Sequence, residues 1–329
     1  MLSTPAVAAT KYWSGYGGSD NISDGNNWWG NVAPSSGDSL FFDNTAGTHF
    51  WANINYGAGS YFDNLKSFSG AGSIRITGDQ TYLYVFENNN NGSLFEATAT
   101  LANRTGPDSD LYINSYGSGG VAVSNVLMQN GKALIFQGAY NTLVNGSISQ
   151  SGTGNATVTK NDAGTLTLTA SSSYGGATTI NGGTVLIANN TALGSTNAGT
   201  TVSSGAALQL SNNITVVDEA LTIAGTGISS GGALRSVSGS NAYTGLITAS
   251  SALTSFGAAS GTTLVISNVN SGGQEFWVVG DGTTIVAGGA TNSGSGTAFV
   301  KTNVGTAILS ASNAWSGAEY IREGTVVLS

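Results

Sequence analysis

The residues that could carry out acid–base chemistry in this sequence are few and widely spaced. Asp108 and Asp110 form a close acidic pair directly after Pro107. Side chains two residues apart in an extended segment point to the same side. Glycoside hydrolysis needs two carboxyl groups on either side of the scissile bond, and no other acidic residue is placed to complete such a site. We interpret the pair as part of a polar turn and keep a polysaccharide lyase or hydrolase as a remote alternative.

Other arrangements that support catalysis or metal binding are incomplete. Asp218 and Glu219 are adjacent and would point to opposite sides of a strand. His49 is the one histidine and cysteine is absent, which excludes a His/Cys metal cluster and leaves no evident partner for nucleophile activation. Residues 20–25 partly imitate a calcium loop, but Ile22 occupies a ligand position and no Glu stands at the twelfth. We therefore predict no enzyme activity, no bound metal and no cofactor.

The composition indicates short strands joined by tight turns. The chain has 49 Gly and 3 Pro, 8% charged and 40% hydrophobic residues, so its polarity comes mainly from Ser, Thr, Asn and Gly. Gly and Asn adopt positive φ at low cost, as turns require. No apolar run is long enough to cross a membrane as a helix. The net charge is −8 with nine Lys and Arg, so a nucleic acid would find no basic stripe.

An internal repeat appears when the chain is aligned with itself. Residues 156–188 align with residues 297–329 without a gap, and 12 of the 33 positions are identical. Tyr174 aligns with Trp315, an aromatic residue with an aromatic residue. A repeat of this kind is typical of architectures in which each unit packs against its neighbours. The identical positions include the pairs Lys160/Lys301, Gly164/Gly305, Leu168/Leu309 and Gly183/Gly324.

The alternation of side chains within the repeat predicts an all-β solenoid. Residues 165–169 alternate Thr and Leu, the period of a half-buried strand. Turns follow every eight to ten residues and no linker interrupts the pattern after about residue 60, which favours a solenoid over a sandwich. We expect turns at Gly164, Gly183, Gly305 and Gly324. We expect the coil core to contain Leu166, Leu168, Ile180, Val185, Ile187, Ile308 and Val326.

The first copy of the repeat resembles the autotransporter-associated β-strand repeat of bacterial passenger domains. The resemblance rests on residues 158–160, 164–168, 174–178 and 181–186. It implies a right-handed parallel β-helix on the outside of a bacterium. The chain ends at Ser329, directly after the last strand of the second copy and without the membrane barrel that ends an autotransporter. We therefore expect export by another route.

The sequence suggests three segments. Residues 1–9 are interpreted as a signal-peptide remnant or an N-terminal arm, residues 10–60 as an aromatic-rich N-terminal β cap, and residues 61–329 as the solenoid. The cap contains Trp13, Trp28 and Trp29, which either cover the first coil or stack on carbohydrate.

These observations predict a secreted bacterial structural protein that self-assembles head-to-tail into a filament, matrix or surface coat. The ends of a solenoid expose unpaired backbone groups that another copy can cover. The alternative is an adhesin that binds cell-surface or matrix glycans or a host surface through the N-terminal aromatic residues. Polymer contacts are expected at Tyr12, Thr325, Val326, Val327, Leu328 and Ser329.

Overall fold

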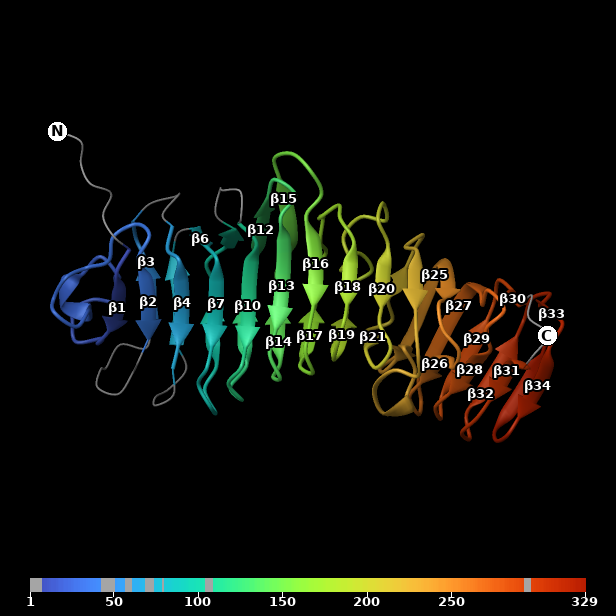
Figure 1. The fold of residues 1–329 in the computed structure, drawn as a ribbon. Coiled ribbons are helices and arrows are strands. Elements are labelled where there is room, and N and C mark those ends of the chain that lie inside the picture. Colours follow the sequence, from blue (N-terminus) through green and yellow to red (C-terminus); the bar gives the residue numbers. More distant parts are fainter. Residues whose placement is uncertain are drawn as a thin grey trace. The chain divides into compact units, whose positions relative to one another are not determined.

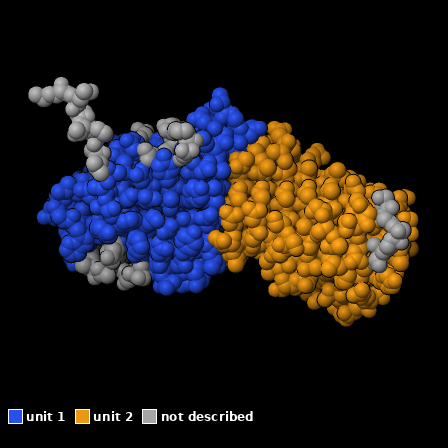
Figure 2. All heavy atoms as spheres, in the orientation of Figure 1, with its two compact units in different colours: residues 1–156 blue, residues 157–329 orange. Residues whose placement is uncertain are grey.

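The computed structural model describes residues 8–42, 51–56, 61–68, 74–78, 80–103, 109–292 and 297–329. His49, Pro107 and Asp108 lie outside the described residues, as does most of the predicted arm at residues 1–9. The chain divides into two compact units, residues 1–156 and residues 157–329, which Figure 2 shows in different colours.

The fold is a parallel β-solenoid, as predicted, and the right-handed winding of its coils stays a prediction. Each strand of a sheet pairs in parallel with the strand one coil further along the chain. Leu65, for example, pairs with Leu40 on the preceding coil and with Phe86 on the following one. Helix is confined, within the described residues, to two 3-10 turns, η1 (Gly25–Asn27) and η2 (Ile228–Ser230). The described residues contain no helix that is long and apolar enough to cross a membrane.

The first unit has three parallel sheets, whose strands follow one another as rungs in Figure 1. The first sheet contains β1 (Thr10–Trp13), β2 (Ser39–Phe42), β4 (Asn64–Ser67), β7 (Val85–Asn88), β10 (Leu111–Ser115) and β13 (Ala133–Gln137). The second contains β3 (Trp51–Ile54), β5 (Ile74–Gly78), β8 (Phe95–Ala97), β11 (Val121–Val123) and β14 (Thr142–Val144). The third contains β6 (Thr81–Leu83), β9 (Leu101–Asn103), β12 (Val126–Gln129) and β15 (Ile148–Ser151).

The region predicted as an aromatic-rich N-terminal β cap, residues 10–60, contributes strands to the same sheets as the coils after it. Strands β1 and β2 pair with each other and β2 pairs with β4, while β3 pairs with β5. The described strands before residue 60 therefore share their sheets with those after it.

The second unit has three rows of strands, two of which join within the long strands β25 (Ser240–Ala249) and β27 (Thr263–Asn270). The first row contains β16 (Thr157–Lys160), β18 (Thr178–Ile180), β20 (Thr200–Val202), β23 (Leu221–Ile223), β30 (Ala290–Asn292) and β33 (Ala314–Trp315). The second contains β17 (Thr165–Leu168), β19 (Thr184–Ile187), β21 (Ala207–Leu210), β24 (Leu234–Ser236), β26 (Thr254–Ala258), β28 (Phe276–Val279), β31 (Thr297–Lys301) and β34 (Ala318–Ile321). The third contains β22 (Thr215–Val216), β29 (Thr283–Val286), β32 (Thr306–Leu309) and β35 (Thr325–Leu328).

The two copies of the repeat occupy different sides of the coil. In the first copy, strand β16 lies in the first row and β17 in the second. In the second copy, the equivalent strands β31 and β32 lie in the second and third rows. The same sequence pattern can therefore form more than one pair of adjacent sides of the coil, because each side requires only a short strand with alternating side chains and a turn.

The predicted core residues are largely buried. Leu166, Leu168, Ile180, Val185 and Ile187 are each at most 2% exposed. Val326 is half-buried.

Ile308 corrects the predicted core, because its half-buried side chain lies on the outward side of β32, whereas its neighbours Ala307 and Leu309 are buried. Strand β32 begins on an outward Thr306, just as β17 begins on Thr165, so the inward positions are the second and fourth. Ile308 pairs with Ile285 and Val327 on the neighbouring coils, which places it in an outward ladder of β-branched side chains.

The predicted turn glycines are required for two distinct reasons. Gly183 and Gly324 have φ values of 63° and 84°, in the left-handed region that other residues adopt at a cost. Gly305 has an ordinary φ, but a Cβ there would lie 2.3 Å from the carbonyl oxygen of Gly282 on the preceding coil. Gly164 occupies the bend before β17.

The repeated lysine is a buried turn cap. Lys160 donates from Nζ to the carbonyl oxygens of Asn161 and Asp162, the latter at 2.8 Å. Lys301 repeats this with Thr302 and Asn303, at 2.6 Å each. Both lysines are at most 3% exposed. Burial lowers the pKa of Lys160 to about 8, against the opposing charge of Asp162.

Candidate binding face

Two of the three predicted cap tryptophans form the interior of the first coils. The rings of Trp13 and Trp28 meet edge to face at 5.1 Å, and both contact Phe42. The indole nitrogen of Trp28 donates to the carbonyl oxygen of Ile22 at 2.8 Å. Trp13 and Trp28 are 2% and 1% exposed, so neither presents a ring face to a sugar. Trp29 is 59% exposed.

The segment that imitates a calcium loop is a polar turn around an apolar side chain. Ile22 is fully buried. The carboxylate of Asp24 accepts hydrogen bonds from the backbone of Asn26 at 3.0 Å and from the hydroxyl of Ser19 at 3.2 Å. The described part of the chain contains no group of three His, Cys, Asp or Glu side chains that could hold a metal.

The outward side of the first sheet carries a continuous row of side chains, one from each coil. The strand register places these residues side by side across six strands. We call them the central row. Its members, in order, are Tyr12, Phe41, Lys66, Glu87, Asn114 and Gln137.

The N-terminal part of the central row is aromatic and partly open to solvent. The ring centroids of Tyr12 and Phe41 lie 5.4 Å apart, and those of Phe41 and Phe68 lie 5.3 Å apart. Tyr12 is 45% exposed and Phe68 is 37% exposed. The exposed Trp29 adjoins this strip, because its backbone N–H donates to the carbonyl oxygen of Tyr12 at 3.0 Å. We call these four residues the aromatic strip.

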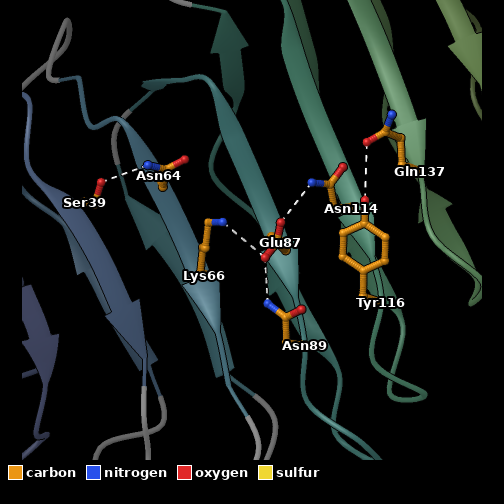
Figure 3. A network of polar contacts seen from close by, with 8 residues as sticks. All are labelled: Ser39, Asn64, Lys66, Glu87, Asn89, Asn114, Tyr116 and Gln137. Atoms are coloured by element: carbon orange, nitrogen blue, oxygen red, sulfur yellow. Dashed lines mark hydrogen bonds and ion pairs between the residues drawn. The ribbon is translucent and has the colours of Figure 1, made fainter. Parts of the chain in front are cut away.

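The middle of the central row is a polar network around one carboxylate (Figure 3). Lys66 Nζ lies 3.2 Å from Glu87 Oε1, which also accepts a hydrogen bond from the Asn89 amide at 2.7 Å. Glu87 Oε2 accepts from the Asn114 amide at 2.9 Å. Ser39, Asn64, Tyr116 and Gln137 extend this polar surface on either side.

Burial by itself would raise the pKa of Glu87. The hydrogen bonds from Asn114 and Asn89 and the charge of Lys66 outweigh that effect, and the pKa lies below its usual value. Glu87 is therefore a fixed anion at neutral pH. Asn114 is 6% exposed and its Oδ1 has no hydrogen-bond partner.

The combination of rings, amides and a fixed carboxylate suits the recognition of sugars. Aromatic rings offer flat apolar surfaces, and amide and carboxylate groups can bind hydroxyl groups in fixed directions. Sequence reasoning did not find the polar part of this face, because Lys66, Glu87 and Asn114 come from three separate coils and are far apart in the sequence. Knowing the length of each coil would have given the strand register and so placed these three residues side by side.

Of the acidic residues considered for catalysis, Asp110, Asp218 and Glu219 lie within the described residues, so the pairing of Asp110 with Asp108 stays a prediction. The carboxylate of Asp110 accepts a hydrogen bond from the backbone of Ala133 at 2.8 Å, a bond that holds neighbouring coils. Asp218 is exposed at a left-handed turn with φ of 57°, whereas Glu219 is 3% exposed.

The residues predicted to make polymer contacts lie on strands that pair within the chain. Tyr12 is in β1, which pairs with β2, and Thr325 to Leu328 form β35, which pairs with β32. Val327 and Leu328 are 39% and 77% exposed, and Ser329 is exposed. Any solenoid segment leaves its outermost strand open in this way, so head-to-tail assembly stays a prediction.

The fold and its repeats define a class, the repeat-built parallel β-solenoids. Within that class, residues 158–187 and 299–328 match the passenger-associated-transport repeat. The chain therefore carries two copies of a repeat found in autotransporter passengers, close to the boundaries found by self-alignment. Such passenger proteins are surface-exposed or secreted.

A curated relative points to the same group of proteins. The adhesin BmaC autotransporter of Brucella suis is 33% identical over 147 residues, which cover 42% of this chain and 4% of that protein. The chain thus matches only a small part of the relative's length. No solved structure matches the chain significantly.

Proposed function

We propose that this chain is a passenger-like segment of a bacterial surface adhesin, and that it binds glycans through the aromatic strip and the polar network beside it. The solenoid holds these side chains at fixed spacing on its outward side. The chain acts outside the cell in this proposal, as a binding surface and not as a catalyst.

The observation that carries the proposal is the composition of the central row. Its exposed aromatic rings lie next to a carboxylate that is held as an anion by Lys66 and two amides. The similarity to an autotransporter adhesin supports the same function independently. In β17 of the second unit the outward positions carry Thr165 and Thr167 instead.

The rigidity of the scaffold supports this function physically. Neighbouring strands of a sheet lie about 4.8 Å apart, so the six positions of the central row span several sugar units. A ligand that binds a preformed row loses little free energy in ordering the protein. Each contact is weak by itself, and an extended glycan would engage several at once.

The test is glycan-array binding by the purified chain, followed by titration of the best glycan against single variants. Tyr12→Ala and Phe68→Ala should each weaken binding about tenfold, the loss of one well-packed aromatic contact. Trp29→Ala tests the outer end of the strip. Tyr320→Ala is the matched control, because Tyr320 is 50% exposed but lies in the second unit.

Equal losses from Tyr12→Ala and Tyr320→Ala would contradict a site on the central row, and an array on which no glycan is bound would contradict carbohydrate binding. Circular dichroism of each variant shows whether the strands are intact. Analytical ultracentrifugation of the same samples tests the head-to-tail assembly: concentration-dependent growth of long oligomers would favour it, and a single small species would oppose it.

A further inference from the structure

The second unit contains a cavity with a buried carboxylate in its wall. Its volume is about 260 Å³, and it lies between the turn that follows β19 and the segment that leads through β22 to β23. Its wall includes Leu193, Gly194, Thr196, Val216, Val217 and Glu219.

The carboxylate of Glu219 is held by one neutral hydrogen bond. Thr200 donates from its hydroxyl to Glu219 Oε1 at 2.9 Å. Within the described residues, no lysine or arginine forms an ion pair with Glu219. A buried carboxylate without a cationic partner is costly, so the cavity wall holds an unbalanced negative charge whenever Glu219 is ionised.

The titratable groups that interact electrostatically with Glu219 are two tyrosines, Tyr174 and Tyr243. Tyr174 lies before β18 and donates or accepts a hydrogen bond with Thr178 at 2.7 Å. Tyr243 in β25 is fully buried, and its hydroxyl has no hydrogen-bond partner. For both tyrosines, burial raises the pKa and the charge of Glu219 raises it further. Asp218, next in sequence, is exposed on the outside of the turn.

The rest of the wall is apolar or weakly polar. Leu193 is 3% exposed and Val216 is 2% exposed, and both line the cavity. Gly194 packs closely on Tyr174, because a Cβ at Gly194 would lie 2.5 Å from the carbonyl oxygen of Tyr174 and 3.0 Å from two of its ring carbons. Val217 is 53% exposed and lies at the open side.

We propose that this cavity binds a primary alkylammonium group, either a free alkylamine or a lysine side chain of a partner, with Glu219 as its counter-ion. The ammonium restores the missing cation, and its three N–H donors match the carboxylate and the hydroxyl of Thr196. Leu193 and Val216 pack against the methylene stem, as lysine stems pack on apolar surfaces elsewhere.

Other ligand classes fit this wall less well. The lining residues include no aromatic ring for a sugar to stack on. A divalent cation requires several oxygen ligands with more than one charge, and Glu219 is the one acidic residue among those that line the cavity. An anion would be repelled.

The experiment is titration of the full chain with n-butylammonium chloride, followed by NMR or calorimetry, with n-butanol and sodium chloride as ligand controls. Butanol has the same stem without the charge. We expect n-butylammonium to bind saturably and butanol to bind at least tenfold more weakly. Equal binding of the two would overturn the proposal.

Glu219→Gln keeps the shape of the side chain and its hydrogen bond from Thr200, and it should weaken n-butylammonium binding at least tenfold. Asp218→Asn removes one charge from the neighbouring exposed residue and should leave binding unchanged. Val217→Arg, a surface substitution, places a tethered cation at the open side and should also weaken binding. Unchanged binding in Glu219→Gln, or equal losses in Glu219→Gln and Asp218→Asn, would overturn the proposal.

Nα-acetyl-lysine methylamide distinguishes the two sources of the ammonium group. Binding at least as tight as that of n-butylammonium assigns the cavity to lysine side chains of a partner, and weaker binding assigns it to free alkylamines. Affinity for either ligand should rise with pH through the range in which Glu219 ionises. Burial raises the pKa of Glu219 against the hydrogen bond from Thr200, so this range lies above that of an ordinary glutamate.

Discussion

Glu87 in the first unit and Glu219 in the second are both removed from solvent, at 9% and 3% exposed, but their pKa values shift in opposite directions. Glu87 has a lysine at 3.2 Å and two amide donors. Glu219 has one threonine hydroxyl. Burial raises the pKa of both carboxyl groups. Only at Glu87 do the neighbouring groups outweigh this effect and lower the pKa.

The difference shows how a solenoid can hold charge in two ways. Along the central row, successive coils each supply one member of the network, so the anion is stabilised by residues from three neighbouring strands. At Glu219 the adjoining coils supply tyrosine and threonine side chains. Within the described residues, the carboxylate has a hydrogen bond from Thr200 but no lysine or arginine beside it. We therefore interpret Glu87 as an anion whose charge its neighbours balance, and Glu219 as a group that awaits a ligand.

The largest expected loss of stability follows from removing the Glu87 carboxylate from the polar network. Glu87→Leu leaves Lys66 and the amides of Asn89 and Asn114 without their acceptor, and should lower the free energy of unfolding by about 3 kcal/mol. Urea unfolding followed by circular dichroism measures this. If this variant is as stable as the wild type, the neighbours of Glu87 do not stabilise the folded protein, and the proposed difference between Glu87 and Glu219 is contradicted.

The next effect concerns the cation alone. Lys66→Met keeps most of the stem and removes the charge, and should cost about 1–2 kcal/mol because the side chain of Lys66 is 25% exposed and screened by solvent. It should also raise the pKa of Glu87 toward its usual value, which carboxyl chemical shifts in an NMR titration would show. Lys11→Met is the control, because it removes a half-buried lysine of β1 that lies outside the network.

An effect of opposite sign is expected at Glu219. Glu219→Gln removes an unbalanced buried charge and should raise the free energy of unfolding by about 1 kcal/mol at pH 8. Asp218→Asn should change it by less than about 0.5 kcal/mol, as for other exposed residues. A marked loss of stability in Glu219→Gln would show that the carboxylate is already paired.

The smallest effect separates the two carboxylates by pH. The pKa of Glu219 is raised on folding, so its contribution to stability falls as the pH rises from the unfolded value of about 4.3 through the folded value. The pKa of Glu87 is lowered, so its contribution is present above about pH 4.3 and is lost as the pH falls through the folded value. Subtracting the stability profile of each Gln variant from that of the wild type should give slopes of opposite sign.

The fold was largely predictable from the sequence because its signal is local. The alternation in residues 165–168 and the glycines at 183 and 324 specify a strand and a left-handed turn without reference to distant residues. Ile308 was assigned to the wrong side, because β-branched residues also occupy outward ladders between coils. Which sides of the coil a repeat occupies depends on the turns before it, as the shift between β16 and β31 shows.

The candidate site was predictable only in part. Trp29 was identified as a possible carbohydrate contact from its residue type, whereas Tyr12 was assigned to the polymer contact. The exposure of Tyr12 follows from its outward position in β1. Trp13 and Trp28 have the same residue type but pack inside, since a tryptophan cluster fits either environment. Lys66, Glu87 and Asn114 come together only through the register of three coils of unequal length.

The burial of the two lysine caps also determines when a protease can cleave the chain at these residues. Lys160 and Lys301 are two of nine basic residues in the chain, and their side chains are enclosed by the turns whose carbonyl groups they bind. A lysine-specific protease needs an extended, accessible segment, so cleavage at either position requires its own coil to open first. The two lysines therefore act as built-in reporters: the rate of cleavage after each one measures how often that copy of the repeat unravels.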